Sequence, residues 1–174
     1  TTATAEMPTA AGRHAAAAGH TGNVFIDAAA QPADVFVVEV SSFQLQYTDR
    51  FRAAVAVWLN VAEDHLDWHP SMADYAEAKA RIWANQADGD VAIVNRGDPV
   101  VMAHAATARA AVQTFGAGGD YRIEDGELIG PDGALMPVTD LPRRLPHDLA
   151  NGLAAWAAAR AAGAGDAAVR RVLS

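Results

Sequence analysis

The sequence predicts an α/β fold: a mostly parallel sheet flanked by helices, followed by a small antiparallel β appendage. Continuous apolar runs, typical of strands buried on both faces of a parallel sheet, alternate with helical patterns over residues 34–111. Short strand patterns separated by Asp-Gly turns follow over residues 112–138. Alternating strands and helices, and then hairpins, favour one α/β domain over residues 1–174.

Three apolar runs are the expected parallel strands, and they cover residues 34–40, 53–61 and 90–95. Helical patterns precede, separate and follow these strands at residues 2–11, 71–87 and 99–111. The end signals agree: Ser71 and Asp98 are suitable N-caps, and Gly12 is a common helix stop. One face of the second helix is apolar, which predicts that this face packs on the sheet. Its members are Tyr75, Ala78, Ile82 and Trp83.

The appendage is expected to contain short strands at 112–115, 121–124, 127–129 and 134–138. Asp125-Gly126 and Asp132-Gly133 supply the hairpin turns, because Asp and Gly tolerate the backbone angles of such turns. Residues 141–146 then form a linker, and two helices are expected at 147–162 and 166–173.

Composition excludes several classes of function. The chain has 174 residues, of which 51% are hydrophobic, so a buried core is expected. Its 13 basic and 21 acidic residues give a net charge of −8, which argues against nucleic-acid and anionic-membrane binding. There is no cysteine, so no disulfide or thiol chemistry is expected, and the cytoplasm is a compatible compartment. No apolar run reaches the length of a membrane span.

Chemistry-bearing residues follow the ends of successive predicted strands. Glu39 ends the first strand, His65 follows the second, and Lys79 lies on the next helix. Ligands bind at the carboxyl edge of open parallel sheets, so Glu39 and His65 are expected there, within roughly 8 Å of each other if their strands are neighbours. Each residue also has a structural interpretation: Glu39 as a strand-end cap, His65 as a hydrogen-bonding side chain, Lys79 as a solvated cation. As a metal ligand, an imidazole by itself suggests zinc or manganese.

This pattern resembles the central, ATP-binding domain of the Mur ligases. The segments that carry the resemblance are Ser41-Ser42-Phe43-Gln44-Leu45 after Glu39, Asn60-Val61-Ala62-Glu63-Asp64-His65-Leu66-Asp67, and Tyr75-Ala76-Glu77-Ala78-Lys79. The resemblance implies ATP and Mg²⁺ as cofactors. It also implies that Glu39, His65 and a carbamylated Lys79 hold magnesium.

The serine-containing segment resembles most closely the family member that adds D-glutamate to UDP-MurNAc-L-alanine. The resemblance then implies that Ser41 lies near the substrate phosphates, that Gln44 hydrogen-bonds the muramic acid portion, and that Asn151 contacts the adenine of ATP. Two positions depart from the family. His20 stands where the family usually has Asn within a Gly19–Gly22 loop, and Asp148 stands where Asn is more frequent.

The implied activity is amide ligation through an acyl phosphate, in cytoplasmic peptidoglycan precursor synthesis. The family's Gly-rich loop ending in Gly-Lys-Ser/Thr does not occur in the sequence, so we expect it upstream. We also expect a UDP-binding N-terminal domain and an amino-acid-binding C-terminal domain outside the chain, which alone is expected to be inactive. The alternatives are another Mur ligase, a ligase like folylpolyglutamate synthase, and a non-catalytic nucleotide-binding domain.

Overall fold

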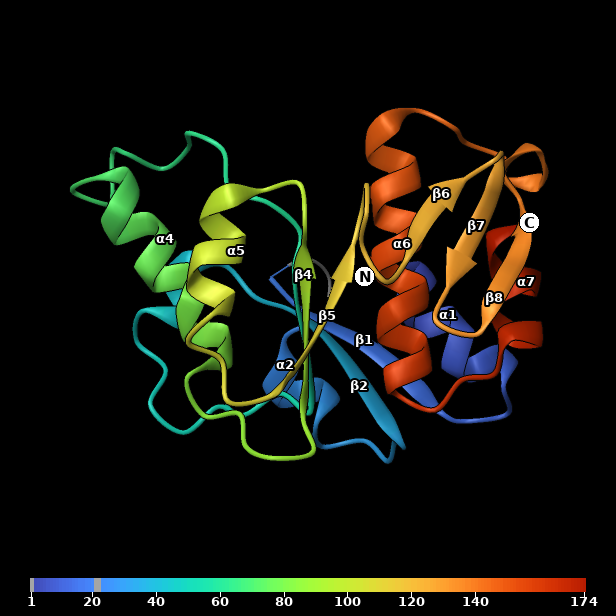
Figure 1. The fold of residues 1–174 in the computed structure, drawn as a ribbon. Coiled ribbons are helices and arrows are strands. Elements are labelled where there is room, and N and C mark those ends of the chain that lie inside the picture. The colour runs from blue at the N-terminus through green and yellow to red at the C-terminus, as the bar shows by residue number, and fades with distance from the viewer. Residues whose placement is uncertain (1, 21–22) are drawn as a thin grey trace.

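The structure is a computed structural model that describes residues 2–20 and 23–174. Its helices are α1 (Thr2–Ala10), α2 (Phe25–Ala28), α3 (Ser42–Leu45), α4 (Met72–Ala80), α5 (Pro99–Ala105), α6 (Pro146–Ala161) and α7 (Asp166–Leu173), with short 3₁₀ helices η1 (Arg81–Trp83) and η2 (Val138–Asp140). Its strands are β1 (Ala15–Gly19), β2 (Val35–Glu39), β3 (Val55–Trp58), β4 (Val91–Asn95), β5 (Ala111–Phe115), β6 (Arg122–Glu124), β7 (Glu127–Gly130) and β8 (Gly133–Pro137). The predicted α/β fold with an antiparallel appendage is confirmed (Figure 1).

Strands β3, β4 and β5 form a parallel sheet that is covered on both faces. Side chains alternate along β4: Ile93 belongs to the hydrophobic cluster with α6, whereas Val94 belongs to the cluster with α5 and η1. This alternation is the two-residue period of a strand, and it explains why the strand has a continuous apolar sequence. Figure 1 shows α4 and α5 on one side of these strands and α6 on the other.

A second parallel sheet pairs β1 with β2, in a register that places Ala15 opposite Val35 and Gly19 opposite Glu39. The expectation that the strands ending near Glu39 and His65 are neighbours in one sheet is therefore wrong. Within the described part of the chain, β2 pairs only with β1, and β3 pairs only with β4. The β2 side chains are half-buried and do not lie within the fully buried core.

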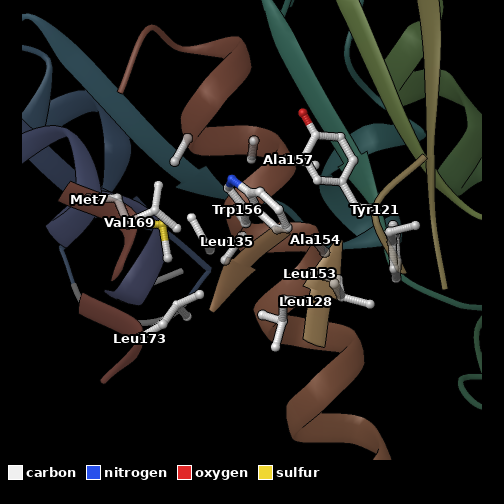
Figure 2. Close-up of a cluster of buried hydrophobic side chains, with 14 of the residues drawn as sticks. Met7, Tyr121, Leu128, Leu135, Leu153, Ala154, Trp156, Ala157, Val169 and Leu173 are labelled. Carbon is white, nitrogen blue, oxygen red and sulfur yellow. The ribbon is translucent and has the colours of Figure 1, made fainter. Parts of the chain in front are cut away.

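The antiparallel appendage consists of β6, β7 and β8, in the predicted positions. The expectation that residues 112–115 also belong to it is wrong, because they form β5, which pairs parallel with β4. Asp125 and Gly126 both take positive φ, 51° and 79°, as the predicted two-residue hairpin turn requires. Gly133 also takes positive φ, at 115°. The appendage packs on α6, where Trp156 is 1% exposed and its ring lies 5.1 Å from that of Tyr121, edge to face. Figure 2 shows this core, to which α1 and α7 also contribute.

Two helices are shorter than their sequence patterns. The helix expected over residues 71–87 consists of α4 followed by the 3₁₀ turn η1, and it ends at Trp83. Helix α5 ends at Ala105, six residues before the expected end at Ala111. Alanine-rich sequence favours helix locally, but residues 106–110 form the connection that returns the chain to β5. Among the described residues, no helix is long and apolar enough to cross a membrane.

Candidate active site

The segment after Glu39 forms a capped helix start. Ser41 is the N-cap of α3: its Oγ accepts a hydrogen bond from Gln44 N at 3.3 Å, and Ser41 N donates to Gln44 Oε1 at 2.9 Å. This reciprocal capping box fixes the turn without help from a ligand. Gln44 is exposed. Its Oε1 accepts the capping hydrogen bond, so we expect its side-chain amide nitrogen to be the group that binds a ligand.

The loop after β3 presents His65 in an uncommon backbone conformation. Its φ is 55°, in the left-handed region, which non-glycine residues rarely occupy. Local hydrogen bonds hold it: His65 N donates to Asp64 Oδ1 at 2.8 Å, and His65 O accepts from His69 N at 2.9 Å. The imidazole is 41% exposed, and its Nε2 lies 3.5 Å from Asp64 Oδ2. An exposed imidazole beside a carboxylate can receive a cation.

Lys79 lies on α4 above the ring of Tyr75, with Nζ 5.0 Å from the ring centroid. It is half-buried, so the interpretation of a fully solvated lysine does not describe it. Carbamylation of Lys79 would replace this cation–π contact, because it turns the side-chain cation into an anion.

Aromatic contacts bring three of the predicted segments together. The Phe43 ring of α3 lies 4.8 Å from the His65 ring, and the Tyr75 ring of α4 lies 5.9 Å from it. Tyr75 also contacts Lys79. The capped turn of residues 41–44 (the serine turn), His65 and Lys79 therefore meet at one aromatic cluster, which contains the rings of Phe43, His65 and Tyr75. The structure thus assembles residues separated by more than 30 positions in the sequence.

One member of this cluster was missed by the sequence analysis. His69, which the sequence analysis does not single out, is 2% exposed, and its Nε2 lies 2.9 Å from Ser42 Oγ. Its ring stacks on Phe43 at 5.7 Å and lies 5.2 Å from Tyr75. The available signal was its place four residues after His65, which suits a turn hydrogen bond but does not reveal the distant partner Ser42.

Glu39 ends β2, two residues before the capping serine. At this point the two strands approach closely, because Gly19 faces Glu39: a Cβ on Gly19 would lie 2.0 Å from Glu39 O. His20 N then donates to Glu39 O at 2.8 Å. The rest of the predicted Gly19–Gly22 loop, Thr21 and Gly22, lies outside the described residues. Because Glu39 and His65 follow strands of different sheets, their proximity stays a prediction that strand pairing does not support.

Asn151 lies in the second turn of α6 and is exposed. Beside it in the sequence, Pro146, Leu149 and Ala150 line an apolar cavity of about 310 Å³, together with Gly116, Ala117, Ile123 and Leu153. Apolar walls with an amide side chain nearby in the sequence are chemically suited to a purine ring. A second, more polar cavity of about 370 Å³ contains none of the predicted site residues. It is lined by Asp74, Glu77 and Ala78 of α4, by Arg81 of η1, and by Gln46, His69 and Pro70.

The donor set fits magnesium only in part. In the described residues no three His, Cys, Asp or Glu side chains are grouped as a ready metal site. Glu39 offers oxygen and His65 offers nitrogen, whereas Mg²⁺ prefers oxygen and usually keeps water and phosphate ligands. A carbamate on Lys79 supplies additional oxygens, so the fit improves when that group forms and substrate phosphates are present.

Comparison with known proteins defines the class. The profile of the Mur ligase middle domain matches residues 13–133, so the chain belongs to the Mur ligase family through its middle domain. A curated relative from Geobacillus kaustophilus (strain HTA426), UDP-N-acetylmuramoylalanine–D-glutamate ligase, is 41% identical over 100% of this chain and 40% of its own length. The corresponding ligase of Mycobacterium avium (strain 104) is also 41% identical, over 88% of this chain and 32% of its own length. The chain therefore spans well under half the length of these relatives.

Solved structures confirm the fold. The UDP-N-acetylmuramoyl-L-alanyl-D-glutamate–2,6-diaminopimelate ligase superposes with a TM-score of 0.81 at 23% identity, over 99% of this chain and 42% of its own. This likeness shows that the arrangement of strands and helices is that of Mur ligase structures. At this identity it carries no information about the substrate.

Proposed function

We propose that this chain is the ATP-binding part of a ligase that joins D-glutamate to UDP-MurNAc-L-alanine in peptidoglycan precursor synthesis. The observation that carries the proposal is the convergence of the serine turn, His65 and Lys79 on one aromatic cluster, in a chain 41% identical to a D-glutamate ligase. The solved neighbours include E. coli FolC in complex with ADP, at 19% identity, but that likeness concerns the fold alone.

We further propose that residues 1–174 are one central domain, acting in the cytoplasm with a UDP-binding domain before it and an amino-acid-binding domain after it. The 40% coverage of the relative's length supports the presence of such partner domains. A phosphate-binding loop preceding the chain completes the ATP site. Under this proposal the isolated chain has no ligase activity.

The chemistry requires an activated carboxylate. The free carboxylate of UDP-MurNAc-L-alanine attacks the γ-phosphorus of ATP, which forms an acyl phosphate and releases ADP. The amine of D-glutamate then adds to the acyl carbon, loses a proton, and displaces inorganic phosphate as the amide forms. Bound magnesium neutralises the phosphate oxygens that the carboxylate must approach.

Each site residue has a role in this scheme. Glu39, His65 and the carbamate of Lys79 hold magnesium. The carbamate forms when the neutral Nζ attacks CO₂ and loses a proton, so that a cation is replaced by an anion with two oxygens. Ser41 lies towards the substrate phosphates, and the Gln44 amide donates to the muramic acid portion.

The adenine is proposed to occupy the apolar cavity at the start of α6, where Asn151 hydrogen-bonds its edge. The walls supply stacking and van der Waals contact, and the amide supplies orientation. The cavity volume of about 310 Å³ suits a base.

The test uses the full-length protein and measures ADP release. We expect release only when UDP-MurNAc-L-alanine, D-glutamate, ATP and Mg²⁺ are all present, with formation of the UDP-MurNAc dipeptide by mass spectrometry. L-glutamate, diaminopimelate with the UDP-MurNAc dipeptide, and a folate with L-glutamate are the comparison substrates. Turnover with one of these sets, and not with D-glutamate, contradicts the assignment.

A further inference from the structure

The buried His69 connects three of the predicted site segments: the serine turn, the His65 loop and α4. Its imidazole bonds Ser42 Oγ at 2.9 Å, its backbone N–H bonds His65 O at 2.9 Å, and its ring lies 5.2 Å from that of Tyr75. Ser42 directly follows the proposed substrate residue Ser41, and Tyr75 supports Lys79. No other described contact links the serine turn to the α4 helix through a buried polar pair.

We infer that His69 is a positioning residue: it holds the serine turn, His65 and Lys79 in one fixed arrangement. This inference rests on the proposed function. Ser42 and His69 are 3% and 2% exposed, so their hydrogen bond is shielded from water and each partner depends on the other for satisfaction. A buried polar pair of this kind specifies one geometry, which a purely apolar contact does not.

The aromatic rings fix the plane of the imidazole. The Phe43 ring stacks on His69 with an interplanar angle of 19°, and Tyr75 lies on it at 40°. Rotation of His69 therefore requires that one of these rings move. Movement of Phe43 disturbs its contact with His65, and movement of Tyr75 disturbs its contacts with His65 and Lys79. Either movement therefore affects at least one of these two proposed magnesium-holding residues.

The C-terminal end of α3 is hydrogen-bonded to η1, the 3₁₀ turn that follows α4. Arg81 Nε donates to Leu45 O at 2.9 Å, and Arg81 also donates to Thr48 O. The carbonyl group of Leu45, the last residue of α3, is thereby satisfied by a cation. Arg81 thus holds Leu45 at the end of α3, and His69 holds Ser42 at its start. Of these two side chains, His69 is the one that also contacts the His65 backbone and the Tyr75 ring.

The experiment compares His69→Phe, Ser42→Ala and their double variant in the full-length protein, with His104→Phe as the matched control. Phenylalanine retains a ring between Phe43 and Tyr75 and removes the hydrogen bond to Ser42. His104 is a half-buried histidine whose ring lies 5.6 Å from Trp58, outside the aromatic cluster. All assays are run well below the thermal unfolding midpoint of each variant. The readouts are kcat, KM for UDP-MurNAc-L-alanine, and magnesium affinity by calorimetry.

We expect His69→Phe and Ser42→Ala each to lower kcat and magnesium affinity by about 10–100-fold, the usual effect of removing a residue that orients ligands. The kcat and magnesium affinity of the double variant should be no lower than those of the more impaired single variant, because both changes remove the same hydrogen bond. His69→Gln, whose amide can still bond Ser42, should recover part of the lost kcat. The His104→Phe control should match the parent.

A merely structural His69 predicts a different result: a lower unfolding midpoint with parent-like kcat, KM and magnesium affinity. That result in Ser42→Ala overturns the inference, even if His69→Phe does not fold. Failure of the proposed function is recognised separately, because the unmutated protein then lacks D-glutamate-dependent ADP release. Calorimetry with magnesium alone still tests the positioning role in that case.

Discussion

Substitution of Gly130 by alanine tests the packing of the β appendage on α6. A Cβ at this position would lie 2.6 Å from Trp156 Cη2 and 2.8 Å from Cζ2. The indole must retreat by about 0.8 Å to restore ordinary contact at 3.4 Å. Gly130 φ lies outside the positive region, so the expected effect comes from overlap with Trp156 and not from backbone strain.

The indole has little freedom to retreat. Trp156 is 1% exposed, and its ring packs edge to face on Tyr121 (Figure 2). Its Nε1 donates to Asp166 Oδ1 at 3.2 Å. Overpacking of a filled core costs about 1–3 kcal/mol in free energy of unfolding. For a chain of this size that corresponds to a fall in Tm of roughly 2–4 °C per kcal/mol.

Gly152→Ala is the matched control, since it adds the same methyl group to the helix that carries Trp156. Its Cβ would meet only Leu173 Cδ2, at 3.9 Å, which is ordinary contact. Alanine is favoured over glycine within a helix by about 0.5–1 kcal/mol, so this variant should be more stable than the parent. Urea unfolding followed by tryptophan fluorescence measures both. Equal stability of Gly130→Ala and the parent would refute the described packing.

Three further predictions concern the site and the pH dependence of stability. In the full-length protein, Lys79→Ala should lose most activity and regain part of it on addition of acetate or formate, because a small carboxylate can replace the carbamate oxygens; Lys79→Arg with substantial activity and no rescue of Lys79→Ala would contradict this. Glu39→Gln should raise the magnesium concentration needed for half-maximal ADP release by at least about tenfold, as loss of a charged oxygen ligand implies, and an unchanged requirement would remove Glu39 from the metal site. The pKa of Asp90 is lowered below 3.8 by hydrogen bonds from Arg52 and from Ala87 N, so its carboxylate stabilises the fold above that pH and the stabilisation is lost as pH falls through the lowered pKa. The stability difference between Asp90→Asn and the parent, measured by urea unfolding, should accordingly be largest near pH 7 and shrink towards pH 3, whereas a constant difference would argue against the ion pair.

The sequence predicted those elements whose side chains determine their conformation. Residues 91–94 are apolar and three of the four are β-branched, and residues 125–126 are Asp-Gly, so β4 and the hairpin turn follow from local chemistry. Strand β1 was missed because Ala15–Gly19 has little β propensity, and its pairing with β2 is decided by tertiary structure. Helix α3 has only four residues, which is too short for a periodic pattern to be seen.

The site was predictable in its residue types and not in its connections. Glu39, His65 and Lys79 stand at strand ends and on a helix, positions that a sequence pattern can identify. The link between Ser42 and His69 joins residues 27 positions apart, and such a contact exists only after α3 and the 65–69 turn have packed together. The separation of β2 and β3 into different sheets was likewise invisible, because an apolar run specifies burial and not a pairing partner.

The conformation of His65 shows how the aromatic cluster and the proposed metal site depend on each other. A non-glycine residue at positive φ costs about 1–3 kcal/mol, and it persists only where surrounding contacts determine it. Here those contacts are the bond from His65 N to Asp64, the bonds from His69 N and Trp68 N to His65 O, and the edge-to-face contact with Phe43. Two of these four contacts come from the turn that His69 closes. A glycine at position 65 would relieve the backbone but remove the imidazole, so the strain is retained by a residue whose side chain lies against Phe43 and Tyr75. The fold therefore retains a strained residue whose imidazole lies between Phe43 of the serine turn and Tyr75 of the Lys79 helix, the position that the proposed magnesium site needs.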